Sequence, residues 1–120
     1  MFIEYAIMED RTESVLRHGG WWESYIKSRK GHAPNIDSKI RYIRKIAENR
    51  TDIMHRYFSD DLLDCILAWK DERNRMIHAL LKQQLVSGEV AALAVQGNTL
   101  ARTLRSRAGS YNRAVERIIH

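Results

Sequence analysis

Arg73, Asn74 and His78 are the residues whose types and spacing best suit chemistry in this sequence. On a helix, Asn74 and His78 share one face, where the amide can hydrogen-bond one imidazole nitrogen and fix its tautomer. The imidazole can then exchange protons near neutral pH, and a guanidinium can hold phosphate oxygens through paired hydrogen bonds. Arg73 lies about 140° around the helix axis from His78. A second helix opposite would bring these groups together, so the motif favours a cleft between two copies of the chain.

A long helix must position these residues, and the sequence predicts one over residues 60–84, with Ser59 as its cap. A first apolar seam, with spacings of three and four, contains Leu62, Ile66, Trp69, Arg73, Met76 and Leu80. A second seam contains Leu63, Leu67, Lys70, Asn74, Ile77 and Leu81. Two apolar sides predict burial against the core and against another subunit. A charge within the first seam predicts that Arg73 either faces a carboxylate or opens into a cleft.

Residues 71–81 resemble the R-N-x-x-x-H signature of HEPN domains, which Arg73, Asn74 and His78 match. HEPN domains are small helical bundles found in bacterial toxin–antitoxin, phage-defence and CRISPR-associated ribonucleases. The resemblance implies a homodimer in which two signatures meet at a cleft and cleave RNA without a metal ion or another cofactor. It also implies that Arg73, Asn74 and His78 are catalytic, and that the partners are RNA, a second copy, and an antitoxin or another protein. Members that act with a nucleotidyltransferase antitoxin carry Tyr two residues after the His, where this chain has Leu80.

RNA cleavage of this kind needs a base for the 2′-hydroxyl proton, an acid for the leaving oxygen, and positive charge beside the phosphate. His78 suits the proton transfers, and in a symmetric dimer the two copies of His78 would divide the acid and base roles. Arg73 would hold the phosphate oxygens. Arg75, close to His78 in the sequence, offers a further phosphate contact or is simply a solvent-exposed charge.

The spacing of the Arg and the His carries little information by itself, because it recurs at Arg50 and His55. The Asn after Arg73 and the apolar surroundings distinguish the 73–78 segment. A structural alternative stays open, with Arg73 in a salt bridge and His78 as an ordinary surface histidine. The corresponding alternative function is a non-catalytic helical module that binds a protein or nucleic-acid partner.

Positive charge is concentrated toward the end of the sequence. The chain has 20 Lys and Arg against 15 Asp and Glu, a net charge of +5, and 14 of the 20 are arginine. Arginine suits bidentate phosphate contacts better than lysine does. On the last predicted helix, four arginines lie opposite the apolar stripe, and with Arg75 they are the candidate RNA-binding residues: Arg102, Arg105, Arg113 and Arg117. The alternative is a solvated basic face without a polyanion partner.

The whole chain, residues 1–120, reads as one all-α domain, an up-and-down bundle of four or five helices. Helical patterns cover residues 2–17, 21–30, 51–58 and 89–119, and a further helix follows Asp37 as its cap. The single Cys65 leaves no internal disulfide and too few thiols for a zinc site, and no metal is expected. No apolar run approaches the roughly 18 residues of a membrane span, and acids replace the basic start of a signal peptide. We therefore expect a cytoplasmic protein without a membrane partner.

Overall fold

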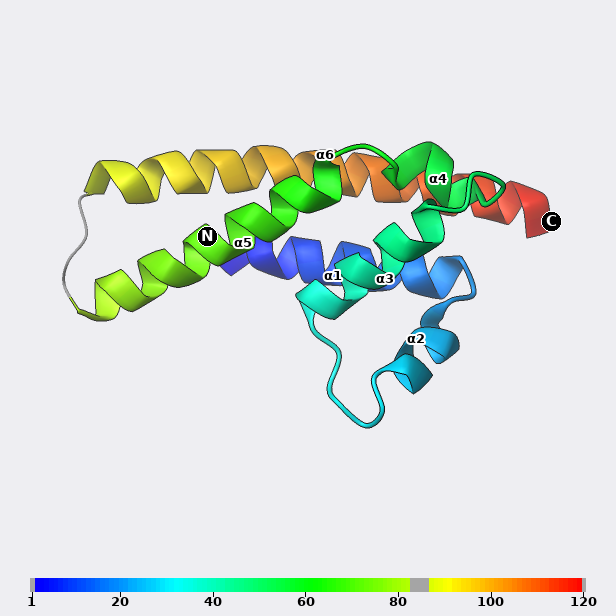
Figure 1. Cartoon of the computed structure of the whole chain (residues 1–120). Helices are drawn as coiled ribbons and strands as arrows, with labels where there is room; N and C mark the ends of the chain where they lie inside the picture. Colours follow the sequence, from blue (N-terminus) through cyan, green and yellow to red (C-terminus); the bar gives the residue numbers. More distant parts are fainter. Residues whose placement is uncertain (1, 83–86, 120) are drawn as a thin grey trace.

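The computed structural model describes residues 2–82 and 87–119, and this part of the chain contains helices and no strand. The expected all-α bundle is confirmed (Figure 1). Four helices are long and two are short: α1 (Phe2–His18), α2 (Trp22–Ser28), α3 (Ile36–Ala47), α4 (Ile53–Phe58), α5 (Leu62–Leu81) and α6 (Ser87–Ile119). With the short helices α2 and α4, the described residues contain six helices, where the sequence predicted four or five. Residues 83 and 84 of the predicted 60–84 helix lie outside the described residues.

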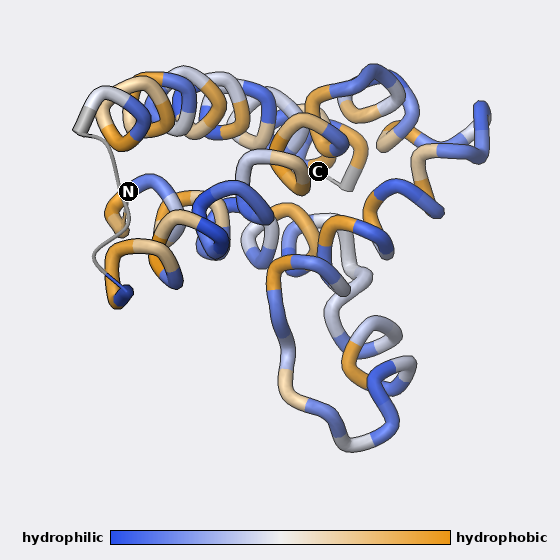
Figure 2. The backbone as a smooth tube through the Cα atoms, turned by 60° about the vertical axis from the view of Figure 1, so that its left-hand side comes forward, coloured by the Kyte–Doolittle hydropathy of each residue, from blue (hydrophilic) through white to orange (hydrophobic). Residues whose placement is uncertain are grey.

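The longest described helix, α6, has 33 residues, and α1, α4 and α5 pack against it. The α1 and α6 helices run side by side in the same direction, whereas α5 runs back along α6 (Figure 1). Apolar residues recur along the long helices (Figure 2), and their buried members form one core that includes Met8, Leu16, Ile40, Ile66 and Leu104. The apolar stripes therefore give one continuous core, as expected for a single domain.

Helix starts differ in detail from the sequence-based expectation. Asn35, and not Asp37, caps α3: its side-chain oxygen accepts a hydrogen bond from the Ser38 backbone N–H at 2.8 Å. The Ser38 side chain completes a capping box with the Asn35 backbone. α5 begins at Leu62, two residues later than predicted, and Ser59, expected to cap it, instead ends α4. The Leu62 N–H donates a hydrogen bond to the Asp60 carboxylate at 3.3 Å.

A tryptophan and a glycine fix α5 against α6. The Trp69 indole is buried, and its Nε1–H donates a hydrogen bond to the Leu93 carbonyl at 2.9 Å. At Gly97, one turn further along α6, an added Cβ would lie 2.4 Å from the Trp69 ring. Only a residue without a side chain allows this approach, so Gly97 sets the distance between the two helices. This contact holds the half of α5 that leads to Arg73 and His78.

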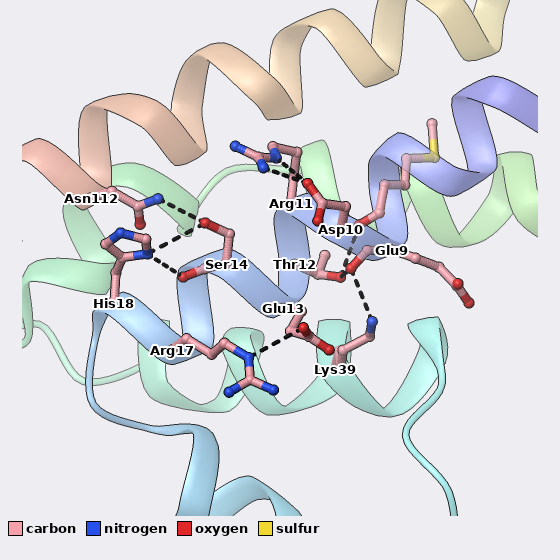
Figure 3. Close-up of polar contacts among 11 residues, drawn as sticks. Glu9, Asp10, Arg11, Thr12, Glu13, Ser14, Arg17, His18, Lys39 and Asn112 are labelled. Carbon is pink, nitrogen blue, oxygen red and sulfur yellow. Dashed lines mark hydrogen bonds and ion pairs between the residues drawn. The ribbon is translucent and has the colours of Figure 1, made fainter.

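Polar contacts join α1 to α3 and α6 (Figure 3). The buried Lys39 ammonium donates a hydrogen bond to the Glu9 backbone carbonyl at 2.9 Å. Burial lowers the pKa of Lys39, and the nearby Glu9 carboxylate opposes that shift. Asn112 donates a hydrogen bond to the Ser14 hydroxyl at 3.1 Å. These bonds fix the register of α1, whose first turn reaches the candidate site on α5.

Among residues 2–82 and 87–119, no helix combines sufficient length with sufficient apolar character to cross a bilayer.

Candidate functional site on α5

The three residues of the signature have different surroundings. Arg73 is buried, with 8% of its surface exposed, whereas Asn74 and His78 are exposed on the next face of α5. The helical period explains the division, because residues five apart cannot share a face. The structure therefore brings Asn74 and His78 onto one solvent-facing stripe and turns Arg73 toward α1.

Arg73 faces aromatic rings, a contact that the spacing of residues 71–81 does not predict. Its guanidinium carbon lies 4.2 Å from the centre of the Tyr5 ring and 5.1 Å from that of Phe2, both in the first turns of α1. These distances suit cation–π contact, which favours a partly desolvated guanidinium. No ion pair joins Arg73 to a carboxylate in the described part of the chain. Of the two expectations for a charge in this seam, neither a carboxylate partner nor an open cleft is observed.

A hydrogen bond connects Arg73 to the next residue. Its Nη1–H donates to the Asn74 Oδ1 at 3.2 Å, while the buried Nε has no hydrogen-bond partner in the described part of the structure. Because Asn74 Oδ1 faces Arg73, its amide NH₂ is left as a donor. Arg73 thus orients Asn74, whose amide lies one helical turn before His78.

The carboxylates near this seam serve Lys70 instead of Arg73. The Lys70 ammonium contacts Asp37 of α3, and it pairs with Asp71 at 2.9 Å. Burial of Lys70 opposes its charge, but hydrogen bonds to Asp37 and Asp71 outweigh the burial and raise its pKa. Burial also raises the pKa of Tyr5, so its hydroxyl stays protonated at neutral pH. Tyr5, Phe2 and Asp37 are site neighbours that local spacing does not reveal.

His78 lies on an exposed face with apolar neighbours. Its ring nitrogens have no hydrogen-bond partner among the described residues, and so they are open to a substrate or to a second chain. Along the second seam of α5, Leu63 is buried, Ile77 is half-buried and Leu81 is 79% exposed. Phe2 and Ile3 of α1 are 70% and 74% exposed. The second apolar side of α5 is therefore covered at its start and uncovered near His78.

Arg75 is engaged by a neighbour on the same helix. Its Nη2–H donates to Glu72 Oε2 at 3.0 Å, and Glu72 raises the pKa of Arg75. Both side chains are about half exposed, so the pair contributes little to stability. A phosphate contact by Arg75 would compete with Glu72.

The four candidate arginines of α6 are all exposed but do not act on one surface. Arg102 lines a hollow between α4 and α6, whereas Arg105 lines another beside Ile3 and Ile7 of α1. Arg113 donates to the Ser110 hydroxyl at 3.3 Å, and Arg117 lies one turn later. Arg102, Arg113 and Arg117 thus follow one line, and Arg105 lies toward α1.

The 50–55 segment has a more enclosed histidine than the 73–78 segment. His55 is half-buried, and its Nδ1 lies 2.7 Å from the Ala47 carbonyl oxygen near the end of α3. Because a carbonyl only accepts, Nδ1 donates in this hydrogen bond. His55 and Arg50 line a hollow of about 330 Å³. Among the described residues, no group of three or more His, Cys, Asp or Glu side chains is arranged to hold a metal ion.

Comparisons with family models, with curated proteins and with solved structures found no match. The interpretation of the site therefore depends on its own residues and on their geometry.

Proposed function

We propose that this protein is a HEPN-like, metal-independent endoribonuclease that acts as a homodimer, as a toxin or defence component in the cytoplasm. The observation that carries the proposal is the exposed stripe of Asn74 and His78 beside uncovered apolar residues. A histidine with open ring nitrogens next to an oriented amide is suited to proton transfer at a bound substrate.

The uncovered apolar residues support a second copy as the completing partner. Most of the side chain is exposed at Leu81, the last residue of α5, and at Phe2 and Ile3 in the first turn of α1. Packing two such faces together would remove apolar surface from water, which stabilises the pair by about 25 cal/mol per Å² of buried apolar surface. In a symmetric pair the same residues meet from both chains, so two His78 side chains would approach one another across the interface.

The cleavage step follows from these groups. One His78 accepts the 2′-hydroxyl proton, and the 2′ oxygen attacks the neighbouring phosphorus. The bond from phosphorus to the 5′ oxygen breaks, and the other His78 protonates that oxygen. The products are a 2′,3′-cyclic phosphate and a 5′-hydroxyl, and no metal ligand is required. In this arrangement Arg73 is a positioning residue that turns the Asn74 amide donors outward.

A non-catalytic role has its own support in the burial of Arg73. An arginine held over two rings and hydrogen-bonded to its neighbour already has a structural purpose. The same exposed face of α5 would then dock an antitoxin or another protein, or bind a nucleic acid, without cleaving it.

A cleavage assay distinguishes the two functions. The purified chain is incubated with end-labelled single-stranded RNA in the presence of EDTA, and the product ends are identified by mass spectrometry. We expect cleavage in EDTA with 2′,3′-cyclic phosphate ends. A protein that binds RNA or a partner chain and cleaves no RNA would establish the non-catalytic function, whereas activity abolished by EDTA would refute the metal-free mechanism.

A further inference from the structure

A second hollow, of about 580 Å³, lies between α4 and α6, at the end of α5 opposite to His78. Its lining is rich in hydrogen-bond donors. Besides Tyr57, the lining consists of three arginines and three residues with hydroxyl side chains: Arg56, Arg102, Arg107, Thr103, Ser106 and Ser110. The Thr103 hydroxyl already donates to the Thr99 backbone carbonyl at 3.0 Å. Guanidinium groups and hydroxyls are the side chains that proteins use to hold phosphate oxygens.

The lining of this hollow includes no carboxylate, and Asp60, outside the lining, pairs with Arg107 and leaves the charges of Arg56 and Arg102 unopposed. The hollow near His55 is different, because Glu48, Asp60 and Asp64 lie in its wall together with Arg44 and Arg50. There the positive and negative groups offset one another, and Arg44 pairs with Asp64 at 2.9 Å. An anion would gain more from the hollow between α4 and α6.

One of the three arginines is held in place by hydrogen bonds. Arg107 donates to Asp60 Oδ2 at 2.6 Å and to the Tyr57 backbone carbonyl at 3.2 Å. Burial opposes the charge of Asp60, but the hydrogen bond from Arg107 prevails and lowers its pKa, so the pair stays charged at neutral pH. Arg107 therefore ties α6 to the end of α4.

The other two arginines remain available for a ligand. Arg56 lies with its guanidinium carbon 5.6 Å from the centre of the Tyr57 ring, and no hydrogen bond or ion pair holds its side chain within the described residues. The same is true of Arg102, which is exposed. These two arginines, one from α4 and one from α6, line the same hollow.

Beyond the hollow, polar side chains continue along one side of α6. Ser106 and Ser110 follow Arg102 at intervals of four residues, and then come Arg113 and Arg117. Such spacing keeps side chains on one side of a helix, over about 22 Å at 1.5 Å per residue. Arg113 already hydrogen-bonds Ser110, so the line joins the hollow to the exposed arginines near the end of α6. A chain of phosphates could follow this line.

We propose that the hollow between α4 and α6 is a phosphate-binding site for a nucleotide unit, with Arg56 and Arg102 as its donors and Arg107, held by Asp60, as part of its lining. The strand of a single-stranded nucleic acid would continue from it along α6. A free nucleotide offers the same phosphate chemistry as a second source. The site is distinct from His78, and its existence does not depend on cleavage of RNA.

Fluorescence anisotropy over a range of salt concentrations tests this site. The probe is a labelled single-stranded oligoribonucleotide with 2′-O-methyl sugars, which cannot be cleaved through a 2′-hydroxyl. The double variant Arg56→Ala, Arg102→Ala should lose about tenfold or more in affinity and reduce the salt slope by about two. The matched control is Arg41→Ala, Arg50→Ala, which removes the same charge from exposed positions outside the hollow and should bind like the parent.

A second arm measures binding of AMP and ADP by calorimetry, which separates the two sources of phosphate. Loss of nucleotide binding in the Arg56 and Arg102 variant, with oligonucleotide affinity unchanged, would assign the hollow to a free nucleotide. Equal losses of affinity in the two double variants would overturn the proposal in favour of general charge attraction, and so would a parent that binds neither ligand. Binding of the 2′-O-methyl probe is read without cleavage, so a parent that binds it through Arg56 and Arg102 but cleaves no RNA would refute the nuclease and leave this site standing.

Discussion

The 73–78 and 50–55 segments both carry an arginine five residues before a histidine, and the fold places them in opposite environments. In the 73–78 segment the arginine is buried and the histidine is exposed. In the 50–55 segment the arginine is exposed and the histidine is half-buried. The element that carries the pair makes the difference: one lies within the continuous helix α5, and the other spans the turn between α3 and α4.

The comparison shows which histidine is already used by the fold. His55 donates to the Ala47 carbonyl and so satisfies a backbone group near the end of α3. The neighbouring Asp52 caps α4 by accepting a hydrogen bond from the Met54 N–H at 2.9 Å. His78 has no such bond among the described residues, and its neighbours are an oriented amide and exposed apolar side chains. The 50–55 segment therefore provides an internal control for substitutions in the 73–78 segment.

The largest expected contrast between the segments is in catalysis. His78→Ala should lower the rate of RNA cleavage by about 10²–10⁴-fold, the usual contribution of a general acid or base. The helix should tolerate this change, because the side chain is exposed and alanine favours helix. His55→Ala should cleave at close to the parent rate while losing about 1 kcal/mol of unfolding free energy with its hydrogen bond. Equal activity of both variants and the parent would reduce the signature to coincidence.

A smaller contrast is expected in stability, between the two arginines. Arg73→Ala removes a guanidinium packed over Tyr5 and Phe2 and should lower the free energy of unfolding by about 1–2 kcal/mol. Arg50→Ala changes an exposed side chain and should stay within about 0.5 kcal/mol of the parent. Urea denaturation of the three proteins provides the comparison. A stable Arg73→Ala protein would mean that the rings do not hold the guanidinium as the structure indicates.

The helices could be predicted because the spacing of apolar residues within each segment indicates a helix and its buried face. The three- and four-residue spacing of Leu62, Ile66, Trp69 and Met76 gives the buried face of α5, and all four are buried. The choice of Asn35 over Asp37 as a cap was beyond the sequence, since both residue types cap helices and only the approach to Ser38 decides.

The site itself was predictable only in part. The exposure of Asn74 and His78 on a common stripe follows from helical geometry. The rings over Arg73 do not, because Phe2 and Tyr5 reach it through the packing of α1, which no spacing within residues 71–81 encodes. Arg56 and Arg107 were likewise missed as candidates. They join Arg102 through the contact of α4 with α6, a tertiary pairing without a local signal.

The central claim is that two copies of His78 share one cleavage site, and a mixing experiment tests it most directly. Parent and His78→Ala chains are mixed in varying proportions at constant total concentration, allowed to exchange subunits, and assayed for RNA cleavage in EDTA. If each site needs both histidines, the rate should fall as the square of the parent fraction, because only parent–parent pairs are fully active. A rate that falls in direct proportion to the parent fraction would show that one chain suffices, and it would contradict the shared site.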